Sequence, residues 1–201
     1  MKAAVRRAWV LALALAASSC GGVPRVRYYT VDIPHASPAS APVVNRHLTV
    51  QRFRADNPLA DDRILYRENP NELNFYEYHR WSSPPRDLVT DYFVHRLKDS
   101  GAYAGVASYK DGLSADYVLQ GRLHRFEEVD RGKEVSVLVA MELELLDAKT
   151  RASVWRGEAE CTRPLATRDL WGVVGGIHGC LDETASSLLT SMQKRLEKAG
   201  N

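Results

Sequence analysis

An alternation of apolar and polar residues dominates the second half of the chain, from residue 116 to residue 162. Every odd-numbered residue from Val135 to Leu145 is apolar. Because successive strand side chains point to opposite faces, these residues all fall on one face. The runs 116–128 and 152–162 are β-prone as well, and the turn-forming segment 130–133 separates the first two runs. The pattern predicts three consecutive antiparallel strands.

Shorter β-prone runs lie in the first half of the chain. A strand is expected to begin near His47, where apolar residues nearly alternate. The runs 63–67 and 73–78 flank the turn-rich segment 68–71 and therefore predict a β-hairpin. Residues 104–109 predict one more short strand.

Two segments instead repeat their apolar residues every three to four positions, which is typical of amphipathic helices. For the first helix, Ser83 is the predicted cap, Pro84 the first helical residue and Ser100-Gly101 the end. The second helix carries an apolar stripe from Leu181 to Leu196. The order of elements predicts an α+β fold, in which two helices pack on one face of a mixed or mostly antiparallel sheet.

The N-terminus has a different character. Three basic residues precede a short apolar segment that ends in Ala17-Ser-Ser-Cys20. This order is typical of a bacterial secretion signal, and its apolar part has about half the length that spans a hydrocarbon core. The cysteine after small residues resembles a lipobox, in which the thiol is acylated and cleavage then makes it residue one, although Ala17 replaces the usual leucine. We predict a signal peptide at residues 1–19 and lipid attachment at Cys20; an ordinary signal peptide that contains a cysteine is the alternative.

Cleavage changes the charge of the chain. Without residues 1–19 the formal charge falls from +2 to −1, because 24 basic residues then face 25 acidic ones. Such a protein lacks the excess of positive charge that is typical of proteins that bind nucleic acids. Residues 20–45 contain four prolines among glycine, alanine and serine, and predict a lipidated tether that reaches about 80 Å. Within it, Tyr28–Ile33 is β-prone and able to pair with the edge of the single domain expected over residues 46–199.

Cys161 and Cys180 are the cysteines that remain besides Cys20. In an exported protein such a pair is readily oxidised, which favours a disulfide. Two buried free thiols on separate elements are the alternative. A disulfide that closes a loop of about 20 residues contributes roughly 3 kcal/mol in the chain-entropy model.

Motifs of catalysis and cofactor binding are missing from the sequence. The six histidines lack HExxH spacing, and the cysteines lack CxxC spacing. There is no GxSxG motif, and no lysine follows the glycines near residue 175 as a phosphate-binding loop would require. We therefore expect neither an enzyme nor a bound metal or other cofactor.

A segment rich in glycine and apolar residues precedes the second helix and is predicted to be a loop. It contains Trp171, Val174 and Ile177, and is more apolar than a solvated connection needs. The loop is expected either to tuck under the sheet or to insert into a partner protein or lipid. Together with Tyr28 and Tyr29, these residues are the candidate partner contacts.

Two stretches resemble the ABC-type transport auxiliary lipoproteins. Tyr28-Tyr-Thr-Val-Asp32 is similar to the YYTL opening of that family, with Val31 where leucine is usual. Asn71-Glu-Leu-Asn-Phe-Tyr-Glu-Tyr-His-Arg-Trp-Ser-Ser-Pro-Pro85 resembles its central block, in which a hairpin leads through an Arg-Trp turn into the first helix. The resemblance extends over residues 26–198, and the cysteine pair with its glycine-rich segment departs from it. In the central block we expect Trp81 to pin the helix onto the sheet and Arg80 to pair with an acid such as Asp87.

The resemblance implies an accessory role without catalysis. The family includes the PqiC-like lipoproteins that accompany MCE-type transporters. It implies an adaptor that is anchored in the outer membrane, faces the periplasm and serves an ABC system for lipids or other hydrophobic molecules. The implied partners are the membrane, through the lipid, and a periplasmic MCE subunit; a homo-oligomer and inner-membrane anchoring stay open. The alternative is a carrier that holds an acyl chain between helix and sheet.

Overall fold

A nine-stranded sheet and two α-helices make up the described part of the chain. The computed structural model describes residues 24–32, 44–112 and 114–200. The predicted signal peptide, Cys20 and most of the predicted tether lie outside these ranges.

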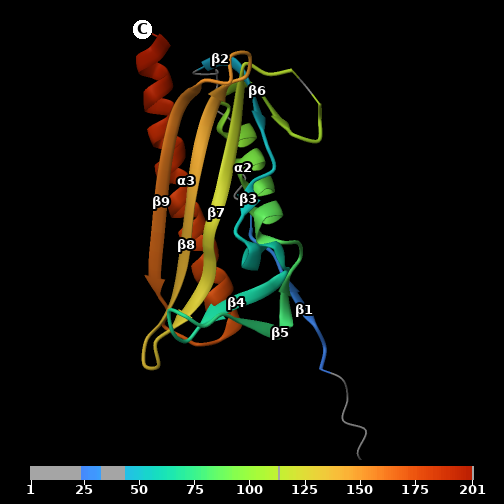
Figure 1. Ribbon diagram of the computed structural model, residues 1–201, viewed down its shortest axis with the longest axis vertical. Coiled ribbons are helices and arrows are strands. Elements are labelled where there is room, and N and C mark those ends of the chain that lie inside the picture. The colour runs from blue at the N-terminus through green and yellow to red at the C-terminus, as the bar shows by residue number, and fades with distance from the viewer. Residues whose placement is uncertain (1–23, 33–43, 113, 201) are drawn as a thin grey trace, which may run out of the picture.

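Three long strands form the body of the sheet (Figure 1). They are β7 (Tyr117–Asp130), β8 (Val135–Asp147) and β9 (Ser153–Pro164), which pair antiparallel in sequence order. The three-stranded antiparallel unit predicted from the alternation is confirmed.

Along its other edge, β7 pairs with three short strands, one after another. These are β2 (Val44–Val50), β3 (Arg54–Ala55) and β4 (Arg63–Arg67), and each runs parallel to β7. The chain therefore follows β7 along its length, interrupted between β3 and β4 by the short 3-10 helix η1 (Asn57–Ala60).

The remaining strands extend the sheet on both sides. β4 and β5 (Asn74–Trp81) form the predicted antiparallel hairpin, and β6 (Tyr103–Ser108) pairs parallel with β2. β1 (Arg27–Tyr29) pairs parallel with β5, so the β-prone patch in the predicted tether does join the edge of the domain.

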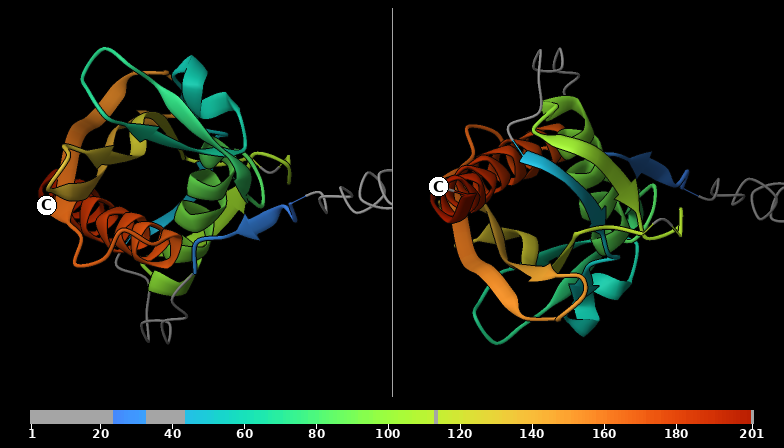
Figure 2. Two further views of the ribbon diagram at one scale, coloured as in Figure 1. Left: turned by 90° about the horizontal axis from the view of Figure 1, so that it is seen from below. Right: turned by 90° about the horizontal axis from the view of Figure 1, so that it is seen from above.

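Both helices lie on the inner side of the curled sheet (Figure 2). Helix α2 (Pro85–Ser100) packs against β6, β2 and β3, and helix α3 (Leu170–Gly200) packs against β9, β8 and β7. The Tyr92 hydroxyl of α2 donates a 2.7 Å hydrogen bond to Asp182 of α3. The predicted α+β class, with a mixed sheet and two helices on one face, is confirmed.

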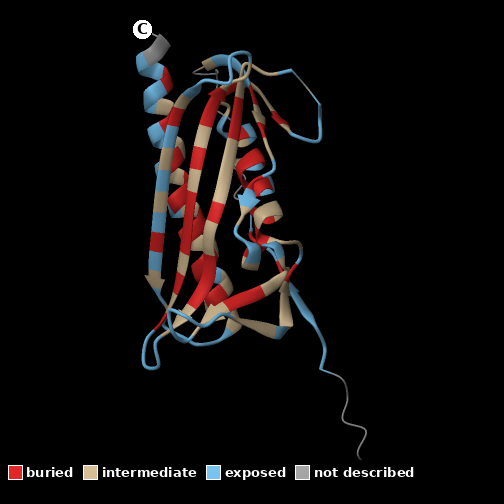
Figure 3. Cartoon of the chain, viewed as in Figure 1, coloured by how far each residue is buried: buried red, intermediate tan, exposed pale blue. Residues whose placement is uncertain are grey.

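One apolar core fills the space between the helices and the sheet. Burial alternates along β8, with Val137, Val139 and Leu143 turned toward the helices and at most 1% exposed (Figure 3). The fully buried residues of α3 include Val173, Ile177 and Leu181. Core side chains therefore occupy the place where the carrier hypothesis put an acyl chain.

The start of α2 differs from the prediction by one residue. Pro84 is the cap and Pro85 is the first helical residue, while Ser83 makes no capping hydrogen bond. A residue that precedes proline is pushed out of the helical region, and Pro84 accordingly has φ −51° and ψ 141°. The predicted end is confirmed, because Gly101 has a left-handed φ of 61° and donates its N–H to Lys98 O.

The predicted pairing of Arg80 with Asp87 is wrong. Arg80 lies 2.7 Å from Asp62, and Asp87 instead accepts hydrogen bonds of 2.5 and 2.7 Å from Arg52. Arg80 belongs to β5, whose neighbour β4 begins directly after the Asp61-Asp62 turn. Strand pairing therefore brings Asp62 to this arginine.

Asp61, in the same turn, predicts a pH dependence of stability. Hydrogen bonds of 3.0 and 2.8 Å from the Arg63 guanidinium lower the pKa of Asp61 from 3.8 to about 2. Since the folded pKa lies below the unfolded one, the pair stabilises the fold above about pH 4 and the contribution is lost toward pH 2. We expect Asp61→Asn to flatten the fall in stability over this interval, measured as urea midpoints at a series of pH values. The exposed Asp91→Asn is the control, and an unchanged slope in the Asp61 variant would contradict the assignment.

The predicted glycine-rich loop is helical, because α3 already begins at Leu170. Asp169 caps this helix, since its side chain accepts a 2.8 Å hydrogen bond from the N–H of Gly172. A Cβ atom on Gly176 would meet Leu165 Cδ2 at 2.6 Å, and one on Gly179 would meet the guanidinium of Arg163. Glycine is unfavourable inside a helix by about 1 kcal/mol. Here it permits the close approach of helix and sheet, and tertiary packing overrides local propensity.

The sheet begins earlier in the chain than the tether prediction placed it. Tyr29 and Val31 are only 5% exposed, and β1 holds residues 27–29 against β5. The stretch between Cys20 and the first strand is therefore residues 21–26. No helix in the described ranges is both long enough and apolar enough to cross a membrane.

Candidate functional site

Three of the predicted contact residues meet at one end of the molecule. We call Tyr28, Tyr29 and Trp171 the aromatic tip. Tyr28 and Tyr29 lie in β1, and Trp171 lies in the first turn of α3, at the lower end of the molecule in Figure 1. The rings of Tyr29 and Trp171 pack edge to face, with centroids 5.5 Å apart. Residues 142 positions apart in the sequence are thus in contact, and Tyr28 precedes Tyr29 in the same strand.

Exposure separates the predicted contact residues into two groups. Tyr28 is 64% exposed and Trp171 is 70% exposed, whereas Tyr29 is 5% exposed and Ile177 is fully buried. Tyr29 and Ile177 are therefore core residues, and Val174 is intermediate. The residues at the aromatic tip that can touch a partner are Tyr28 and Trp171.

Hydrogen bonds connect the aromatic tip to the rest of the sheet. The Tyr29 hydroxyl lies 2.9 Å from His79 Nδ1 of β5, and burial together with the charge of Arg27 lowers the pKa of His79. The Tyr29 backbone carbonyl accepts a 2.6 Å hydrogen bond from the N–H of Ser82. β1 is thus joined to the sheet by the backbone and the side chain of Tyr29.

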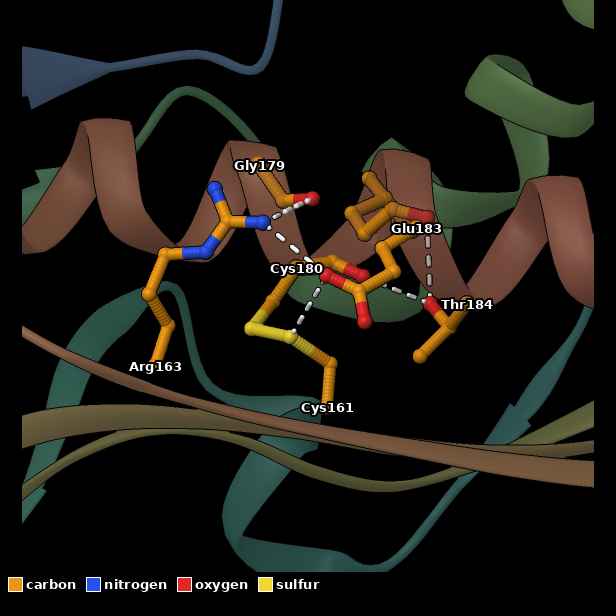
Figure 4. Close-up of a disulfide and its surroundings, with 7 residues drawn as sticks. Cys161, Arg163, Gly179, Cys180, Glu183 and Thr184 are labelled. Atoms are coloured by element: carbon orange, nitrogen blue, oxygen red, sulfur yellow. Dashed lines mark hydrogen bonds and ion pairs between the residues drawn. A yellow bond between two sulfur atoms is a disulfide. The ribbon is translucent and has the colours of Figure 1, made fainter.

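A disulfide fastens α3 to the edge of the sheet (Figure 4). Cys161 of β9 and Cys180 of α3 are bonded, with Cα atoms 5.3 Å apart. Next to the bond, Arg163 lies 3.0 Å from Glu183. This ion pair was not predicted, although residues 161 and 163 share a strand face and residues 179, 180 and 183 share a helix face.

The outer edge of β9 has no strand partner among the described residues. β9 pairs with β8 alone over its twelve residues. Its outward-facing side chains alternate with buried ones and include Arg156, Glu158 and Glu160, all of them exposed. An edge strand presents unpaired N–H and C=O groups to any extended segment of another chain.

A groove of about 890 Å³ lies on the face of the sheet opposite the helices. Apolar residues, among them Val129, Leu138 and Pro164, line it together with charged residues. Arg67 and Arg125, at its wall, both donate to Glu127 Oε1, at 2.9 and 2.6 Å. Glu127 is only 1% exposed, whereas the Arg67 and Arg125 side chains are 18% and 35% exposed. In this ion network two partly exposed arginines thus neutralise a buried carboxylate. The ion network was not predicted, because its members come from β4 and β7, which are far apart in the sequence.

A second buried carboxyl group, that of Glu128, forms no direct ion pair among the described residues, although the charge of Arg168 acts on it. Glu128 of β7 is 3% exposed and accepts a 2.7 Å hydrogen bond from the Tyr76 hydroxyl. Burial raises the pKa of Glu128. Within the described ranges, no three histidine, cysteine or acidic side chains are placed to hold a metal ion.

Comparison with known proteins agrees with this architecture. The family model described as "ABC-type transport auxiliary lipoprotein component" matches residues 29–188. No curated protein matches the chain.

Solved structures share the fold. Protein XCC0632 from Xanthomonas campestris, of the family DUF330, superposes with a TM-score of 0.77 at 22% identity, and the match covers 87% of this chain and 99% of that one. A further uncharacterised protein gives a TM-score of 0.67 at 14% identity, over 84% of this chain and 99% of the other. The hypothetical protein CT253 from Chlamydia trachomatis gives 0.52 at 8% identity, over 74% and 96%. These likenesses concern the fold.

Proposed function

Because this chain belongs to the family of ABC-type transport auxiliary lipoprotein components, we propose that it is a non-enzymatic adaptor tethered to the outer membrane by lipid on Cys20. The family is a family of lipoproteins, which places the chain in the cell envelope, as an auxiliary part of an ABC transport system. In this proposal the domain faces the periplasm, and its partner is a periplasmic MCE-type subunit. The proposed transported material is lipids or other hydrophobic molecules.

The open edge of β9 is the observation that supports docking most directly. A strand from a partner that adds to this edge would satisfy the unpaired backbone groups, which is a recurrent mode of peptide recognition. The charges of Arg156, Glu158 and Glu160, one positive and two negative, would select the register and the partner. The disulfide and the Arg163–Glu183 pair hold β9 in place from its inner side. A preordered edge lowers the entropic cost of docking.

A photo-crosslinking residue at position 158 tests this docking surface. In membranes that contain the whole transport system, we expect a crosslink from position 158 to the periplasmic subunit. The same residue at position 91, exposed on α2, is the matched control and should give none. Equal crosslinking from both positions, or crosslinks from position 91 alone, would contradict docking at β9.

Cys20→Ser in the same cells should release the protein from the membrane, because the acyl chains contribute about 0.8 kcal/mol per buried CH₂.

A lipid carrier is the second candidate function, and the groove on the outer face of the sheet is the observation in its favour. Its lining combines apolar residues with three arginines and three glutamates, which suits an amphipathic ligand with a polar headgroup. Native mass spectrometry of the purified protein distinguishes the two roles. Co-purified lipid at one-to-one stoichiometry supports the carrier, and lipid-free protein that still crosslinks from position 158 supports the adaptor.

A further inference from the structure

The length of chain between the anchor and the sheet limits how far the domain can stand from the membrane. Seven residue steps separate Cys20 from Arg27, the first residue of β1. A fully extended chain spans at most about 3.6 Å per residue, which gives about 25 Å for these steps. This is roughly a third of the reach of about 80 Å expected for a free tether of 25 residues. A lipid on Cys20 would therefore keep β1 next to the membrane surface.

The aromatic tip is the part of the fold that β1 carries into this position. Tyr28 directly follows Arg27, and Trp171 packs on the neighbouring Tyr29. β1 and the start of α3 lie at the same end of the molecule, while the C-terminal end of α3 lies at the opposite end (Figure 1). Of the whole described fold, this end is the one that the anchor brings closest to lipid.

The chemistry of the tip fits the headgroup region of a bilayer. Tryptophan and tyrosine concentrate at membrane interfaces, because each has an apolar body and one polar group. Tyr28 and Trp171 are among the few large apolar residues that are exposed, and Val26, which is 37% exposed, lies two residues before Tyr28. Arg25 and Arg27 are exposed on the same segment. Arginine side chains there extend toward phosphate groups and attract anionic lipids.

The tip is also held rigidly. Tyr29 is buried, bonded to His79 and packed against Trp171, and the helix that carries Trp171 is tied to β9 by the disulfide. Because the Trp171 ring is already packed on Tyr29, its contact with the membrane costs little additional side-chain entropy.

We propose that the aromatic tip lies in the lipid headgroup region beside the anchor, with Trp171 and Tyr28 inserted and Arg25 and Arg27 at the phosphates. This inference rests on the lipid anchor of the proposed function. It directs the long axis of the domain away from the bilayer, so that β9 extends from the membrane toward the partner. The aromatic tip thus acts as a second, non-covalent contact that orients the adaptor.

Tryptophan fluorescence in vesicles tests the insertion of Trp171. The full chain has four tryptophans; Trp81 is fully buried, Trp155 is 9% exposed, and Trp9 lies in the predicted signal peptide. In a Trp9→Phe background, the lipoprotein is reconstituted into vesicles of phosphatidylethanolamine and phosphatidylglycerol with brominated acyl chains. We expect bromolipid to quench the emission of Trp171 and acrylamide to lose access to it. Trp171→Phe should abolish the lipid-dependent quenching, and Trp155→Phe, the matched control, should retain it.

Flotation of the vesicles separates failure of the anchor from failure of the tip. If the protein floats but Trp171 stays accessible to acrylamide and is not quenched by bromolipid, the tip proposal alone is overturned. The aromatic tip would then face water or contact a partner protein. Protein that does not float would overturn the anchor, and the tip proposal with it. In the reverse-charge variant Arg25→Glu/Arg27→Glu, we expect reduced bromolipid quenching with phosphatidylglycerol present. Equal quenching in that variant would overturn the role of the two arginines.

Discussion

Replacing Trp81 with alanine is expected to lower the free energy of unfolding by about 3 to 5 kcal/mol, the range for large-to-small changes at fully buried aromatic residues. The Trp81 side chain is completely buried, and its ring packs on Phe126 with centroids 5.1 Å apart. The indole N–H has no hydrogen-bond partner among the described residues, so the loss is one of packing. Trp81 also pairs with Tyr29 across β5 and β1, and the cavity would loosen the attachment of β1.

Urea denaturation followed by circular dichroism measures this loss. Trp171→Ala is the matched control, because it deletes the same side chain at a site that is 70% exposed, where the change should stay within about 0.5 kcal/mol. Trp81→Phe keeps much of the packing and should cost less than alanine. A loss below about 1 kcal/mol for Trp81→Ala would show that the core collapses around the missing ring.

Removal of the disulfide is expected to cost about 3 kcal/mol. Cys161 and Cys180 are 19 residues apart in sequence, and the chain-entropy model gives roughly this value for such a loop. Both cysteines are buried, at 5% and 0% exposure, and their bond joins β9 to α3. Its loss should therefore reduce both the stability and the order of the β9 edge.

Two independent ways of opening the bond provide the check. Reduction of the wild-type protein and the double variant Cys161→Ala/Cys180→Ala should shift the urea midpoint by similar amounts, at an unchanged slope. The double variant itself should not respond to reductant. Two reactive thiols in the unreduced, denatured protein would contradict the bond. An unchanged midpoint after reduction would contradict its contribution to stability.

Local patterns predicted most of the elements. The alternation in residues 134–147 predicts β8, and its odd-numbered apolar residues are the ones that face the helices. The αL residue Gly101 ends α2 where the sequence indicates. Each of these features depends on neighbours within a few residues, which is why the sequence shows them directly.

Three other features were predicted wrongly or not predicted, because they depend on residues that are distant in the sequence. The glycines before Cys180 predict a loop but lie in α3. Leu165 and Arg163 leave no room for larger side chains there, so the glycines reflect close packing of the helix on the sheet. Arg80 meets Asp62 through strand pairing. The Glu127 ion network draws on two strands that are 60 residues apart.

The sequence by itself determined the periods of the strands and helices and the family to which the chain belongs. The signal segment and the lipid anchor at Cys20 are predictions that also come from the sequence. These follow from residue order and short-range physical chemistry. Only the tertiary structure decided that β1 belongs to the sheet, that Trp171 packs on Tyr29, and that the outer edge of β9 is open within the described ranges. Each of these depends on which distant segments come to lie side by side, and that is set by the burial of one shared core.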